Sequence, residues 1–136
     1  MCPATVYSAN NILDREFGNS AYTPPSSFFL GLSTSTPSYS GSGFSEPSDP
    51  QYSRVSVVNN KTTFSVSASG LISNNLTISF PQSGSSWNVI STLGFFDASA
   101  SVTNHLRAWI SLAQPITVSA SSIVTFQPGT ITLNLV

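Results

Sequence analysis

The chain has very few charged side chains. It carries four lysines and arginines and five aspartates and glutamates in 136 residues, whereas charged residues make up about a quarter of an ordinary soluble protein. The four cations are scattered singly, so the sequence lacks the clustered positive charge that nucleic-acid binding requires. We therefore expect a component of an assembly rather than an enzyme, with no nucleic-acid partner. These cations are Arg15, Arg54, Lys61 and Arg107.

Disulfides, membrane spans and metal clusters are also missing from the sequence. Cys2 is the only cysteine, so no internal disulfide can form. No run reaches the roughly 18 apolar residues of a membrane-spanning helix, and the first residues lack the basic segment and apolar run of a signal peptide. We expect a protein that is made and folded in a cytoplasm, without membrane insertion, metal or cofactor.

Catalysis has one candidate pair of residues. His105 is the only histidine, and Asp97 precedes it across a serine-rich turn, so a hairpin could bring the two side chains together. A Ser-His-Asp hydrolase is one interpretation. We favour an imidazole at the edge of a strand, because serine is frequent throughout the chain and no Gly-x-Ser-x-Gly elbow is present. We predict no catalytic residues.

The chain has instead an alternation of apolar residues with serine and threonine. Residues 71–80 put apolar side chains on one face of a strand and hydroxyls or amides on the other. The apolar run 28–32 predicts a buried central strand, and Asn59-Asn60 predicts a tight hairpin. Short strands separated by turn signals predict a mainly β single domain, an antiparallel β-sandwich or barrel-like fold with its strand-rich core at 53–136.

Residues 8–17 form the one predicted helix, with Ser8 or Asn10 as its cap and Gly18-Asn19 as its end. Such a short helix is marginal alone, so its apolar stripe must dock on its own sheet or on a neighbouring subunit. That predicted stripe consists of Ile12, Leu13 and Phe17. An extended arm, residues 18–27, follows the helix and contains Pro24 and Pro25.

Residues 33–52 are rich in serine, proline and glycine and predict one long loop. Loops of this length in a small domain are usually functional or mobile. Its aromatic residues, among them Tyr39 and Phe44, either pack onto the domain or present a contact site.

Four further aromatic residues could form either a core or a glycan-stacking platform, and we favour the core. Phe95 and Phe96 are adjacent and should point to opposite faces of a strand. One of them should therefore face outward, as our best candidate for an interface residue. The set consists of Trp87, Phe95, Phe96 and Trp109.

The order of several short motifs resembles a known family. The motifs include Asp14-Arg15-Glu16-Phe17-Gly18, Ala21-Tyr22-Thr23-Pro24-Pro25, Phe29-Leu30-Gly31-Leu32-Ser33, Gly43-Phe44-Ser45-Glu46-Pro47, Tyr52-Ser53-Arg54-Val55, Leu93-Gly94-Phe95-Phe96-Asp97-Ala98 and Val124-Thr125-Phe126-Gln127-Pro128-Gly129. Nearly the whole chain is similar to small virion proteins of tailed bacteriophages, commonly labelled tail fibre or minor tail proteins.

The resemblance implies a structural virion protein of the tail fibre or baseplate region, assembled in the bacterial cytoplasm and contributing to host adsorption. Its expected partners are further copies of itself, with a trimer as the first guess, other phage structural proteins and a host surface glycan. The alternatives are a capsid decoration (cement) protein and a glycan-binding module. The candidate interface residues are Ile12, Leu13, Phe17, Pro24, Pro25, Tyr39, Phe44, Trp87, Phe95 and Phe96.

Overall fold

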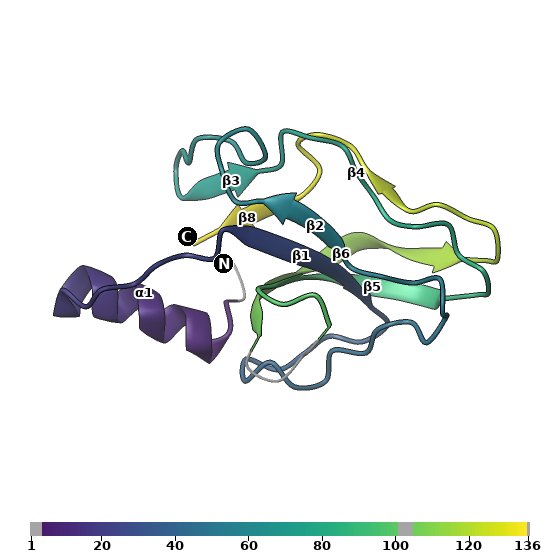
Figure 1. Ribbon diagram of the computed structural model, residues 1–136, viewed down its shortest axis with the longest axis horizontal. Coiled ribbons are helices and arrows are strands. Elements are labelled where there is room, and N and C mark those ends of the chain that lie inside the picture. The colour runs from purple at the N-terminus through teal and green to yellow at the C-terminus, as the bar shows by residue number, and fades with distance from the viewer. Residues whose placement is uncertain (1–3, 101–104, 136) are drawn as a thin grey trace.

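A computed structural model describes residues 4–100 and 105–135 (Figure 1). The described part is mainly β with one N-terminal helix, its sheets are antiparallel, and they form no closed barrel, which confirms the predicted fold class. The elements are α1 (Val6–Gly18), β1 (Ser27–Ser33), β2 (Val55–Val58), β3 (Leu71–Ser73), β4 (Ile78–Ser79), β5 (Asn88–Phe96), β6 (Leu106–Val118), β7 (Thr125–Phe126) and β8 (Thr132–Asn134).

Four strands form the main sheet, in the order β2-β1-β5-β6. The apolar run 28–32 lies in β1, a central strand of this sheet, as predicted. Two short ribbons, β3 with β8 and β4 with β7, make up the rest of the strand structure in the described residues. Side chains of the main sheet and of both ribbons meet in one apolar core, so the ribbons serve as the second layer of a sandwich.

The main sheet is covered on both faces at its centre. Leu30 and Leu93 lie in the larger core, between the sheet and the ribbons. Phe96, Leu106 and Trp109 form a second apolar cluster, on which the ring of Phe44 packs. Phe44 comes from the long connection between β1 and β2, so this connection acts as a lid over the second cluster.

The predicted hairpin at Asn59-Asn60 is wrong. β2, which precedes it, pairs with β1 and not with the segment that follows. The Asn60 side-chain oxygen accepts hydrogen bonds from the backbone N–H groups of Thr62 and Thr63, each at 3.0 Å, and so closes a local turn instead. The Asn59 amide donates to the carbonyl of Pro25 at 2.8 Å and ties the arm to the end of β2.

The predicted strand 71–80 is interrupted at Asn74, which is buried. Its amide nitrogen donates to the carbonyls of Leu76 at 2.9 Å and Gln127 at 3.0 Å, and its oxygen accepts from the N–H of Ile131 at 2.9 Å. One satisfied side chain therefore replaces the ladder hydrogen bonds of a continuous strand. The chain can then turn from β3, which pairs with β8, to β4, which pairs with β7.

Candidate assembly surface

The first turn of α1 is fixed to the sheet by Thr5. The buried hydroxyl of Thr5 accepts a hydrogen bond from the N–H of Ser8 at 3.4 Å and donates to the carbonyl of Leu106 at 2.8 Å. The N–H of Thr5 donates to the carbonyl of Arg107 at 3.1 Å. The direction in which α1 leaves the domain is therefore set by hydrogen bonds to β6.

The helix begins earlier than its pattern predicts. It runs from Val6, so neither Ser8 nor Asn10 caps it, and Thr5 takes that place because its hydroxyl is held against β6. The predicted end is confirmed: Asn19 is the C-cap in the left-handed conformation with φ 53°.

One face of α1 points away from the domain. Val6 is 52%, Leu13 54% and Phe17 86% exposed, and Figure 1 shows the helix projecting beyond the end of the sheet. Ile12 does not share a stripe with these residues, because successive residues are about 100° apart around a helix; it is 40% exposed and lines a groove of the domain instead. The predicted stripe is therefore wrong for Ile12, and the outward stripe is not docked on its own sheet.

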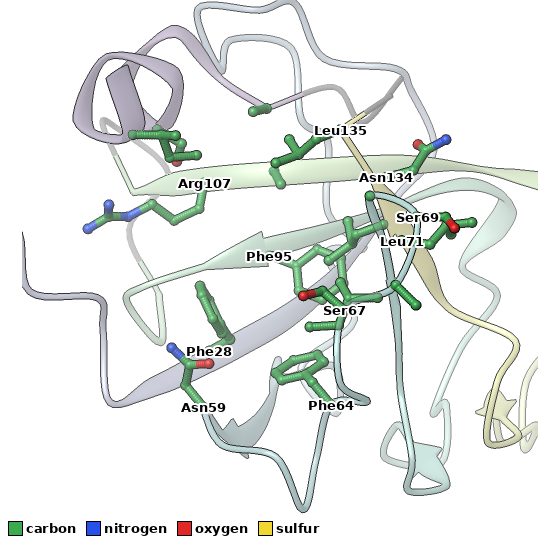
Figure 2. Close-up of a pocket in the computed structure, with 18 of the residues that line it drawn as sticks. Phe28, Asn59, Phe64, Ser67, Ser69, Leu71, Phe95, Arg107, Asn134 and Leu135 are labelled. Carbon is green, nitrogen blue, oxygen red and sulfur yellow. The ribbon is translucent and has the colours of Figure 1, made fainter. Parts of the chain in front are cut away.

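An apolar groove of about 530 Å³ lies between the start of α1, the main sheet and the β3–β8 ribbon (Figure 2). Phe28, Phe64 and Phe95 line it from within the larger core, and Leu71 and Leu135 contribute from the ribbon segments. The groove is therefore an open end of the sandwich, where core side chains reach the surface next to the helix.

Arg107, the charged residue that the structure places in this groove, is neutralised by Asp97. The Asp97 carboxylate accepts from Arg107 Nε at 2.7 Å and contacts His105 Nδ1 at 2.5 Å, which confirms the expected approach of His105 and Asp97. Arg107 also donates to the hydroxyl of Tyr22 at 3.0 Å. The Asp97 carboxylate therefore contacts Arg107 as well as His105. The hydrogen bond from Arg107 to Tyr22 ties the arm to the sheet.

A second ion pair anchors the long connection between β1 and β2. Glu46 accepts from Arg54 Nε at 2.9 Å and Nη2 at 2.8 Å, and from the hydroxyl of Tyr52 at 2.6 Å. The Arg54 side chain is only 2% exposed and stacks 3.5 Å from the centroid of the Phe96 ring. Burial and the adjacent Glu46 carboxylate raise the pKa of Tyr52, so it remains a neutral donor.

Asp49 holds the same connection against the start of β5. Its carboxylate accepts from the indole N–H of Trp87 at 2.8 Å and from the backbone N–H groups of Gln51 at 3.0 Å and Gly84 at 2.7 Å. These hydrogen bonds, that from Gln51 first, lower the pKa of Asp49 to about 2. Sequence reasoning missed this residue, since its donors lie far apart along the chain.

The four aromatic residues lie in the core, as we favoured, and do not form the alternative glycan platform on the surface. Trp87, Phe95 and Phe96 are at most 2% exposed and Trp109 is 8% exposed. The prediction that one of the two adjacent phenylalanines faces outward is wrong, because the long connection covers the second face of the sheet with Phe44 and Arg54. Phe44 itself is half-buried in this contact.

The long connection does present one exposed aromatic residue. Tyr39 is 59% exposed, with its ring 6.2 Å from that of Trp109. Beside it in the sequence, the hydroxyls of Ser38, Ser40 and Ser42 lie 2.7 to 3.1 Å from one another. The aromatic residues of this loop were expected either to pack onto the domain or to present a contact site. Phe44 packs onto the domain, and Tyr39 is exposed and can make a contact.

The two candidate residues of the arm differ in exposure: Pro24 is exposed and Pro25 is half-buried. Part of the serine-rich segment between Asp97 and His105 lies outside the described residues.

Within residues 4–100 and 105–135, no helix has the length and apolarity needed to span a bilayer. Over the same residues, histidine, cysteine, aspartate and glutamate nowhere gather in a group of three that could hold a metal ion.

The described part of the chain is a charge-poor β-domain with a projecting helix, one face of which is apolar and exposed. A family model described as Podophage GP4 fiber I protein gp80 matches residues 3–134. The match covers nearly the whole sequence, so the chain belongs to this phage fibre family and is a virion component. A search among curated proteins finds no match. The family confirms the resemblance to phage tail fibre proteins.

Proposed function

We propose that this protein is a non-enzymatic structural part of the tail fibre, in the fibre or baseplate region, and that it works as a homo-oligomer. Three copies is the number that we expect, since phage fibres are commonly three-fold. The copies assemble with one another and with other phage proteins in the cytoplasm of the bacterial host.

The observation that carries this proposal is the outward stripe of α1. A helix of 13 residues is marginal in water unless its apolar face is covered. Phe17 and Leu13, which are i and i+4 neighbours on this face, remain largely exposed in the single chain. A symmetric assembly of identical chains can cover them without any further partner.

Self-association is tested by measuring the mass of the purified protein by light scattering after gel filtration. We expect a single oligomeric species, and dissociation when Leu13→Ser and Phe17→Ser are combined. Val66→Ser is the matched control, because Val66 is an apolar residue that is 75% exposed and lies far from the helix in sequence. A wild-type mass equal to one chain at high protein concentration would rule the proposal out.

The place in the particle is tested by immunogold labelling of intact virions. We expect gold at the tail. Gold over the head would support the alternative of a capsid decoration protein, for which particles that lack the protein should burst at lower temperature.

We also propose a contribution to host adsorption by the exposed tip of the long connection. Tyr39 offers an aromatic face, and the neighbouring serine hydroxyls offer neutral hydrogen-bonding groups of the kind that sugars bind. Phages with Tyr39→Ala should assemble normally and adsorb more slowly to the host. Adsorption equal to wild type would exclude this role for Tyr39.

A further inference from the structure

The outward face of α1 has the spacing of a coiled-coil seam. Val6, Asn10, Leu13 and Phe17 follow one another at intervals of four, three and four residues, which is the alternation of d and a positions in a heptad. At about 100° per residue, the four side chains fall within about 60° of one another around the helix. Asn10 is exposed, like its three apolar neighbours on this seam.

The opposite face of the helix belongs to the domain. Ser8 is buried, the amide nitrogen of Asn11 is buried, and Ile12 lines the apolar groove. In the same heptad these residues occupy f, b and c, which are the positions farthest from a coiled-coil seam. The sheet therefore holds α1 with its a and d positions turned away from the domain, where another helix can reach them.

From these two observations we infer that copies of α1 from different chains pack against one another in parallel and in register, with their Asn10 side chains meeting at the seam. This inference rests on the self-association proposed above and adds its geometry. The partner is a second copy of this chain.

Asn10 favours a parallel over an antiparallel arrangement of the packed α1 helices. A buried amide that finds no hydrogen-bond partner is costly. In a parallel, in-register bundle the amide of one Asn10 faces the amide of another, and each can donate and accept. In an antiparallel arrangement it would face leucine or valine and remain unsatisfied. A single asparagine at an a position is a known means of fixing the register of parallel helices.

The charges of the helix are compatible with this packing. Asp14 and Glu16 flank the seam at e and g, and Arg15 lies on the domain side at f. In a parallel pair a g residue faces the e residue of the following heptad of its partner. Glu16 would thus face a position beyond Gly18, where the helix has ended, and Asp14 would face Ala9. No acidic pair is forced together.

The helix has fewer than two full heptads, so the seam acts together with the domain that carries it. Thr5 supplies this connection, because its hydrogen bonds to β6 fix the base of the helix. The domain presents the seam already folded and oriented, which lowers the entropy cost of association.

The first test is disulfide cross-linking of the full chain in a Cys2→Ser background. Leu13→Cys should give a covalent dimer under mild oxidation, because equivalent d positions lie side by side in a parallel seam. Arg15→Cys is the matched control on the domain side of the same helix and should give none. Efficient cross-linking of the control with none at residue 13 would overturn the inference.

The second test is Asn10→Asp, which preserves the size of the side chain. Carboxylates brought together at the seam should reduce association roughly 100-fold or more at pH 7, and association should return at about pH 4 as they become protonated. The urea midpoint of the dissociated variant should equal that of the dissociated Leu13→Ser, Phe17→Ser variant, because Asn10 makes no buried contact in a single chain.

The outcomes separate the two proposals. If the wild-type chain is oligomeric but Asn10→Asp associates like wild type at pH 7, self-association stands and the parallel seam is wrong. If the wild-type chain is a monomer at high concentration, both are wrong. Cross-linking at residue 13 together with pH-dependent association of Asn10→Asp supports both.

Discussion

Replacing Glu46 by glutamine should destabilise the domain strongly, although Glu46 is not part of either apolar cluster. The substitution keeps the size of the side chain and removes its charge. Arg54, whose side chain is 2% exposed, would then be a buried cation without the bidentate carboxylate, while its Nη1 would still donate to the carbonyl of Ala98 at 2.7 Å. Removing one member of a buried ion pair costs about 3–5 kcal/mol. We expect about 3 kcal/mol here, because the glutamine oxygen can still accept one hydrogen bond.

The free energy of unfolding should be measured by urea denaturation at pH 7 and at one fixed protein concentration, since association contributes to stability. A loss of about 3 kcal/mol corresponds to a fall of roughly 10 °C in the melting temperature for a domain of this size. Glu16→Gln is the matched control, since Glu16 is exposed on α1 and its replacement should change stability by less than about 0.5 kcal/mol.

A double variant tests whether the buried charge of Arg54 causes the expected loss of stability. Arg54→Met added to Glu46→Gln removes the buried cation and keeps an apolar side chain on Phe96, so it should recover part of the lost stability. The reasoning is refuted if Glu46→Gln costs less than about 1 kcal/mol, or if the double variant is no more stable than the single one.

Three further predictions concern the same domain. Because the folded pKa of Asp49 is about 2, below its ordinary 3.8, the carboxylate stabilises the fold above pH 4, and this contribution is lost as the pH falls towards 2; urea midpoints should show the loss in wild type and a smaller one in Asp49→Asn. Gly94→Ala would place a methyl 2.6 Å from the Phe44 ring and should cost about 1–3 kcal/mol in urea denaturation, whereas Gly18→Ala, whose methyl would lie at an ordinary contact distance of 3.8 Å from Ser20 Oγ, should be nearly neutral. Trp87→Ala should cost about 3–5 kcal/mol by the same measurement, and a stable fold with lost sugar binding would contradict its place in the core.

Local patterns were sufficient for the elements whose cause is local. The apolar run 28–32 predicted a central strand, because a strand buried on both faces must be apolar throughout. Gly18-Asn19 predicted the end of α1, because glycine and asparagine tolerate the left-handed conformation that often ends a helix. The approach of Asp97 to His105 also follows from the antiparallel pairing of β5 with β6, which places Phe96 opposite Leu106.

The sequence-based predictions that were wrong concern side chains whose contact partners are distant in the sequence. Asn74 interrupts a well-patterned strand because its hydrogen-bond partners include Gln127 and Ile131. Phe95 and Phe96 point to opposite faces of the sheet, which predicted that one of them is exposed. Neither is, because a loop from another part of the chain covers the second face of the sheet. Alternation reports which side of a strand a residue takes, and not what lies over that side.

The sequence by itself determined that this is a charge-poor, mainly β phage fibre protein with an amphipathic N-terminal helix, because composition, periodicity and motif order are all properties of the linear chain. Only the tertiary structure decided which face of that helix is available. Helix geometry alone places Ile12 on another side of α1 than Leu13 and Phe17. The hydrogen bonds of Thr5 to β6 decide that the side with Ile12 lines the groove and the side with Phe17 faces away from it. The orientation of a helix depends on contacts between residues that are about a hundred positions apart, and no local pattern contains them.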